Sequence, residues 1–168
     1  MNIYLLRHGI AAPLGQENQF QDEERALTSE GILKMRKAAQ GLKRLGVTFD
    51  MIVSSPLVRA RQSADIVADV LRFREAISLW EDLEPGGSPE DVAQKLAEFP
   101  ERDSVLLAGH QPSIGCLASY LISRNPKVSL PFKKGAIFCV GVTEVPPQQP
   151  AELKWMLTSK MLRQIAEL

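Results

Sequence analysis

The sequence predicts an α/β fold: a three-layer α/β/α sandwich on a mainly parallel sheet, with a late antiparallel edge strand. Short apolar runs, each suited to a buried strand, alternate along the chain with segments whose apolar residues recur at helical spacing. The only two histidines both follow such runs, His8 after residues 2–6 and His110 after residues 104–108. Because ligands bind beyond the carboxyl ends of parallel strands, we expect the two histidines to face each other at one edge of the sheet.

Composition favours an ordinary soluble protein. The chain has 168 residues, 45% hydrophobic and 24% charged, which predicts a single domain over residues 1–168 with a substantial core. The net charge is zero, so we expect no general attraction to nucleic acid or to a membrane, although a local basic pocket stays open. No apolar stretch is long enough for a membrane span and no secretory signal is visible, so we expect a cytoplasmic protein. Cys116 and Cys139 are scattered, which predicts reduced core residues and not a metal site.

A helix is expected after the first strand and the polar loop at 10–27. Thr28 suits the N-cap of this helix, and Gly46 suits its end. Its expected inward positions recur at helical spacing and are Ile32, Met35, Ala38 or Ala39, Leu42 and Leu45. Lysines and arginines fill the other face, which we interpret as solvated surface.

A strand at 50–54 leads into a second helix. Ser55 is its expected N-cap and Pro56 its first residue, where proline suits a helix. Arg59 lies in the first turn, where a cation opposes the helix dipole at a cost of up to about 1 kcal/mol unless an anion is nearby. Arg61 lies two positions on and points elsewhere. Arg59 is therefore the candidate anion-binding residue.

The rest of the chain predicts four more strands and three more helices. The expected elements are a strand at 76–79, an acidic loop at 81–87, a helix from Ser88 to about Phe99, a strand at 104–108, a helix from Pro112 to about Ile122, strands at 135–145 and 152–158, and a short final helix. A proline-rich turn joins the last two strands, which we expect to pair as an antiparallel edge hairpin.

Four stretches, in order, resemble the motifs of the histidine phosphatase superfamily. They are Leu6-Arg7-His8-Gly9, Arg25-Ala26-Leu27-Thr28 with Gly31, the segment from Ser54 to Ala64, and Gly109-His110-Gln111-Pro112. An Arg-His-Gly triplet alone is a weak signal, whereas the ordered set spans about two thirds of the chain. The compact length and the residues around the second histidine are similar to SixA-type phosphohistidine phosphatases. The resemblance implies a phosphoglycerate mutase-like fold.

The resemblance implies a phosphatase that forms a covalent phosphohistidine intermediate on His8. The other residues that it implies for the catalytic and substrate-binding site are Arg7, Gly9, Arg59, His110 and Gln111. The chemistry agrees, because arginine offers planar donors to a phosphoryl group and neutral histidine is a competent nucleophile. We expect His110 to be cationic while phosphate is bound. No metal or other cofactor is expected, because the arginines and histidines neutralise the phosphoryl charge.

The acidic loop at 81–87 leaves open whether an enzyme acid protonates the leaving group. Relatives that act on phosphate esters place a carboxylate after the third strand, and Asp82 aligns best with it, beside Glu81 and Glu84. Solvated surface is the alternative interpretation of these acids. Phosphohistidine leaves as a nitrogen base that can itself be protonated, so it depends less on an enzyme acid.

Three functions stay open from the sequence. About twenty residues separate Asp82 from Ser104, too few for the roof that relatives acting on sugar phosphates carry. We therefore expect an open pocket for a phosphorylated protein, such as a phosphorelay domain. A small-molecule phosphomonoesterase, which would depend on Asp82 or a neighbouring acid, is the alternative enzyme. A phosphoprotein-binding module without turnover is the third function, although binding alone would not need both histidines. The chain departs from the family pattern at Ile10, where an acid is frequent, and at Ser63, where threonine is usual.

Overall fold

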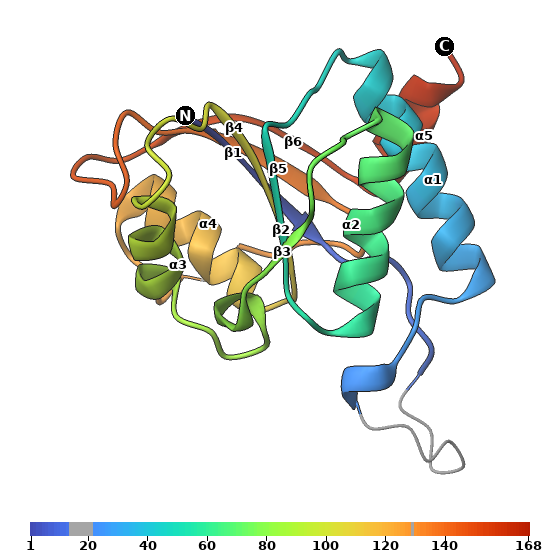
Figure 1. Cartoon of the computed structure of the whole chain (residues 1–168), viewed down its shortest axis with the longest axis horizontal. Coiled ribbons are helices and arrows are strands. Elements are labelled where there is room, and N and C mark those ends of the chain that lie inside the picture. Colours follow the sequence, from blue (N-terminus) through green and yellow to red (C-terminus); the bar gives the residue numbers. More distant parts are fainter. Residues whose placement is uncertain (14–21, 129) are drawn as a thin grey trace.

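A mixed six-stranded sheet forms the centre of the computed structural model, which describes residues 1–13, 22–128 and 130–168. Its strands are β1 (Asn2–Arg7), β2 (Met51–Ser54), β3 (Ser78–Leu79), β4 (Ser104–Gly109), β5 (Ile137–Gly141) and β6 (Glu152–Leu157). They lie in the order β3-β2-β4-β1-β5-β6 (Figure 1). The first four strands pair in parallel, while β5 and β6 are antiparallel to their neighbours. The α/β fold and the antiparallel pairing of the two late strands are confirmed.

Helices cover both faces of the sheet and complete three layers. They are α1 (Ser29–Arg44), α2 (Val58–Leu71), α3 (Pro89–Leu96), α4 (Ser113–Ser123) and α5 (Ser159–Ala166), with 3-10 turns η1 (Asp22–Glu24) and η2 (Glu81–Leu83). In Figure 1, α1, α2 and α5 lie on one side of the sheet, and α3 and α4 lie on the other. None of the described helices is long and apolar enough to cross a membrane.

The core consists of two apolar clusters, one on each face of the sheet. Side chains of β1 alternate between them: Ile3 and Leu5 pack toward α3 and α4, whereas Tyr4 and Leu6 pack toward α1, α2 and α5. Because both faces are covered, the central strands are continuous apolar runs without a polar alternation. Each fully buried aliphatic side chain contributes about 1.5–3 kcal/mol, which holds the ends of β1 and β4 in place.

The helix starts match the sequence at α1 and α3 but not at α2. Thr28 and Ser88 cap α1 and α3 through their side chains, as expected. The expected start of α2 is wrong, because this helix begins at Val58 and has no side-chain cap. The Ser55 hydroxyl accepts from the Leu57 amide at 3.3 Å, just before the helix, and also lies 2.9 Å from Nε2 of His110. It therefore contributes both to the turn before α2 and to a tertiary contact that the local pattern did not predict.

Two expected inward positions of α1 are also wrong. Ile32 and Leu45 are 40% and 47% exposed, while the other four expected inward residues are buried. Leu45 lies past the last helical residue, as the C-cap. Gly31 takes the buried place beside Ile32, because its backbone packs so closely against the Ile10 carbonyl that a Cβ would collide with it.

The strand expected at 135–145 is shorter in the structure. It begins only at Ile137, since Gly135 has a φ of 70° and belongs to a turn. The Gly135 amide donates to the carbonyls of Arg7 and His8, at 3.0 and 3.1 Å. Hydrogen bonds from this turn therefore hold the start of β5 against the end of β1, where the candidate site lies.

Candidate active site

The two histidines meet at the carboxyl ends of β1 and β4. Arg7 and Gly109 are register partners in the parallel pair, so the residues that follow them emerge side by side. The ring centroids of His8 and His110 are 5.1 Å apart, and the rings are tilted by 51°. Their exposed fractions are 6% and 2%. The expectation that the histidines face each other is confirmed.

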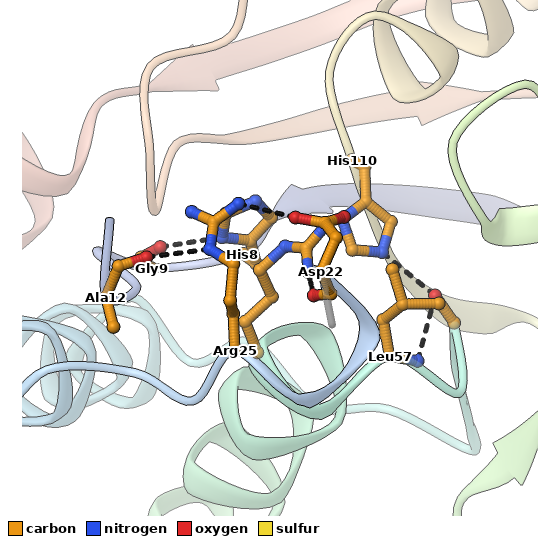
Figure 2. Close-up of polar contacts among 9 residues, drawn as sticks. His8, Gly9, Ala12, Asp22, Arg25, Leu57 and His110 are labelled. Carbon is orange, nitrogen blue, oxygen red and sulfur yellow. Dashed lines mark hydrogen bonds and ion pairs between the residues drawn. The ribbon is translucent and has the colours of Figure 1, made fainter. Parts of the chain in front are cut away.

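His8 is held in the tautomer that a nucleophile requires. Its Nδ1 lies 2.7 Å from the Gly9 carbonyl, which can only accept, so Nδ1 carries the proton and donates (Figure 2). Nε2 therefore keeps its lone pair. Burial lowers the pKa of His8 to about 4, helped by the charges of Arg59 and Arg7 and opposed by the Gly9 hydrogen bond. The imidazole is thus neutral at pH 7.

His110 is neutral in the free site as well. Burial, followed by the proximity of His8 and the Arg59 charge, lowers its pKa to about 3. The carboxylate of Asp22 acts in the opposite direction. Among the described residues, no partner bonds the buried Nδ1 of His110. We still predict that His110 becomes cationic when phosphate binds, because a dianion beside the imidazole ring raises the pKa of the ring.

Both imidazoles should therefore stay neutral from pH 7 down to about pH 5 in the free protein. The depressed pKa values of about 4 and about 3 move protonation below the ordinary midpoint near 6.5. Nitrogen chemical shifts of ¹⁵N-labelled protein, followed against pH, would test this, since the chain has only two histidines. Added inorganic phosphate should move the midpoint of one ring upward. A midpoint near 6.5 for both rings without phosphate would contradict the buried, neutral pair.

The two arginines approach the histidines from different elements. Arg7, at the end of β1, donates from Nη1 to the Phe132 carbonyl at 2.5 Å, and burial lowers its pKa. Arg59 lies in the first turn of α2 and is 4% exposed. Its Nη2 donates to Oδ2 of Asp22 at 2.9 Å, and its Nη1 donates to the Asp22 carbonyl at 2.6 Å. An anion thus lies beside Arg59, which offsets the unfavourable position of a cation at a helix start.

Asp22 is a site residue that the sequence did not single out. It lies in η1, within the stretch expected to be surface loop, and nothing in that stretch distinguishes it from the neighbouring acids. Its carboxylate binds Arg59 and Arg25, which together hold its pKa below the usual range against the opposing effect of burial. Figure 2 draws Asp22 near His110, and the charge of Asp22 acts on that ring. The carboxylate therefore occupies donors that a phosphoryl group would need.

Replacing Asp22 by asparagine should tighten the binding of a tetrahedral or similar oxyanion. The carboxylate competes with the incoming anion for Arg59, and an exchange of partly exposed ion pairs is worth roughly twofold to fivefold in Kd. Calorimetric titration with tungstate would measure the change. Asp65→Asn is the matched control, because Asp65 pairs with Arg61 on the outer side of α2. Weaker tungstate binding in Asp22→Asn would show that this carboxylate supports the anion site and does not compete with it.

Ser63 connects the first motif, at Gly9, with the third, to which it belongs. Its Oγ accepts from the Gly9 amide at 3.0 Å and donates to the Arg59 carbonyl at 2.7 Å. Ser63 follows Arg59 by four residues, so the helical repeat places both on one face of α2, a signal that could have identified it. A hydroxyl suffices for this contact, which explains how serine serves where threonine is usual.

Gly9 and Gln111 were expected to contact the substrate, and that role stays a prediction. At Gly9 a Cβ would lie 2.6 Å from Cγ of Met35, so the residue must be small. The Gln111 side chain donates to the Leu130 carbonyl at 3.1 Å and accepts from the Phe132 amide at 3.3 Å. Because the Phe132 carbonyl binds Arg7, Gln111 helps to position that arginine.

Asp82 lies in η2, where its carboxylate forms an ion pair with Lys95. The Lys95 ammonium holds the pKa of Asp82 below its ordinary value. A general acid must carry a proton, so the ion pair with Lys95 disfavours Asp82 as the general acid. The role of Asp82 as a general acid stays an untested prediction. Among the described residues, no three or more His, Cys, Asp or Glu side chains are grouped as a metal ion would require.

Comparisons with known proteins point to one family. The family model of the histidine phosphatase superfamily (branch 1) matches residues 3–84. The chain is 30% identical to the phosphohistidine phosphatase SixA of Escherichia coli over 123 residues, which cover 72% of this chain and 74% of that protein. An uncharacterized protein of Picosynechococcus is 31% identical, with 94% and 99% coverage. The structure of the protein histidine phosphatase SixA complexed with tungstate superposes with a TM-score of 0.84 at 26% identity, covering 95% of this chain and 98% of that one.

Proposed function

We propose that this chain, which belongs to the histidine phosphatase superfamily and is a phosphatase of the SixA type, hydrolyses phosphohistidine side chains on other proteins. The observation that carries the proposal is the neutral His8, whose free Nε2 lies among cationic side chains. The phosphoglycerate mutase-like fold brings these groups together from three elements: β1, α2 and the end of β4. We take residues 1–168 to be a single histidine phosphatase domain.

The proposed reaction has two steps. Nε2 of His8 attacks the phosphorus atom, the bond from phosphorus to the substrate imidazole breaks, and the released nitrogen takes up a proton. Water then attacks the phosphorus atom on His8, which releases inorganic phosphate and restores the imidazole. Arg7, Arg59 and His110 neutralise the charge that builds on the three equatorial oxygens, so the reaction needs no metal ion. The arriving phosphoryl group takes the place of the Asp22 carboxylate on Arg59.

Two features support a protein substrate. Between η2 and β4 the chain forms only α3, an eight-residue helix, so this region supplies no roof over the site. Asp82, the candidate acid of the ester-cleaving alternative, is engaged with Lys95. An imidazole leaving group tolerates this arrangement, because its nitrogen accepts a proton readily. A phosphorelay domain with a phosphorylated histidine is the partner we propose, which places the enzyme in cytoplasmic signal transduction.

Phosphate release from a phosphohistidine-bearing protein and from a simple aryl phosphate tests the proposal. We expect faster turnover of the phosphohistidine protein, and Asp82→Asn should change that rate less than about twofold, as for a partly exposed ion pair that does no chemistry. Faster turnover of the ester, with loss in Asp82→Asn, would favour the small-molecule phosphomonoesterase. Absence of turnover of both substrates, with phosphate still bound, would leave the phosphoprotein-binding module.

A further inference from the structure

A basic cavity lies beside the candidate active site. Its volume is about 490 Å³, and Arg7 and Gly9, the two neighbours of His8, form part of its wall. The other cationic side chains that line it are Lys34, Lys133, Lys134, Lys160 and Arg163. Among the described residues, no acidic side chain lines it. A chain with a net charge of zero thus concentrates positive charge at one side of its catalytic residues.

The cations come from three separate segments that the fold brings to one place. Lys34 lies on α1, Lys133 and Lys134 precede β5, and Lys160 lies in the first turn of α5. The Gly135 amide donates to the carbonyls of Arg7 and His8, so these hydrogen bonds hold the two lysines before Gly135 close to the end of β1. The charge of Lys134 contributes to the lowered pKa of His8. The cavity and the phosphate site therefore share one electrostatic environment.

Three of the lysines that line the cavity form, among the described residues, no ion pair that would account for their position. Lys133, Lys134 and Lys160 are exposed, and none forms an ion pair with a described residue. Lys34 pairs with Glu30 within α1. Unpaired like charges around one cavity repel each other, and an anion that entered would relieve this repulsion.

We propose that the cavity is a second anion-binding subsite, which receives carboxylate side chains that flank the phosphohistidine of a protein substrate. This inference rests on the proposed function. A volume of about 490 Å³ exceeds what one phosphate needs and falls in the range of sites for larger groups. Successive residues of an extended chain advance by about 3.3 Å, so an acidic side chain two or three residues from the phosphohistidine can reach past Arg7 into the cavity.

Two phosphohistidine peptides would test the subsite. One carries aspartate and glutamate around the phosphohistidine, and the other carries asparagine and glutamine at the same positions. The enzymes are the wild type, the double variant Lys133→Gln/Lys160→Gln, and the control Lys43→Gln/Lys127→Gln, which removes two exposed lysines outside the cavity. We expect the wild type to favour the acidic peptide about tenfold in kcat/KM, mainly through KM. This preference should fall to about twofold in the cavity variant and persist in the control.

The outcomes separate this inference from the proposed function. Equal turnover of the two peptides by the wild type, or an equal loss for both in the cavity variant, would overturn the subsite alone. A lysine-dependent preference for a small ester with a second phosphate, without a preference for the acidic peptide, would also overturn it, because the occupant would then not be a protein. Hydrolysis of aryl phosphate without hydrolysis of either peptide would overturn the proposed function, and the subsite with it.

Discussion

Replacing His8 by alanine should abolish turnover, lowering kcat by about 10⁴-fold to 10⁶-fold, as when a covalent nucleophile is removed elsewhere. The neutral imidazole, with Nδ1 bonded to the Gly9 carbonyl, has Nε2 as its free nucleophilic atom. Alanine offers no atom that could accept the phosphoryl group. Single-turnover release of phosphate from a phosphohistidine protein would measure the loss, and acid-labile ³²P-labelling of the enzyme would measure the intermediate.

Binding measurements separate this loss from misfolding. Arg7, Arg59 and His110 remain in His8→Ala, so tungstate should still bind with a Kd within about threefold of the wild-type value, since neutral His8 contributes no charge. The thermal unfolding midpoint should confirm that the variant is folded. If His8→Ala still formed a labelled phosphoenzyme, His8 would not be the nucleophile.

Replacing Arg59 by alanine should lower kcat/KM by about 10³-fold, which is the scale of losing one arginine that stabilises the charge of a transferred phosphoryl group. The side chain is 4% exposed and presents its guanidinium to the anion site, where Asp22 now lies. Arg59→Lys should recover only part of the activity, because an ammonium keeps the charge and loses the planar fork. Steady-state kinetics with the phosphohistidine protein would measure both effects.

Arg61→Ala is the matched control on the same helix. Arg61 lies two residues further along α2 and pairs with the exposed Asp65, away from the histidines. We expect kcat/KM within about twofold of the wild-type value, in line with the small worth of a surface ion pair. If Arg61→Ala lost as much activity as Arg59→Ala, the loss would come from α2 as a whole and not from the Arg59 guanidinium.

Local patterns predicted most of the fold. Alternating apolar runs and helical repeats identified the strands and helices, because both faces of the sheet must be covered and each helix needs one buried stripe. The errors arose where a tertiary contact competes with a local signal. Ser55 has the sequence of a helix cap, but α2 begins three residues later, and the Ser55 hydroxyl contacts His110 as well as the Leu57 amide. Gly31 lies on the buried face of α1 in the region where Ile32 was expected, because only glycine permits the close approach to Ile10.

Sequence by itself determined that both histidines lie at one edge of the sheet, and the catalytic roles assigned to them stay a prediction. His8 and His110 each follow a buried strand, and two parallel strands of that kind must deliver them to one edge. Tertiary structure alone decided the surroundings of the two histidines, which set their protonation state. Asp22 lies 37 residues from Arg59 along the chain, and the basic cavity draws on α1, α5 and the turn before β5. Spacing along the chain cannot encode such contacts, because they depend on how separate elements pack and on which charges that packing leaves near one another.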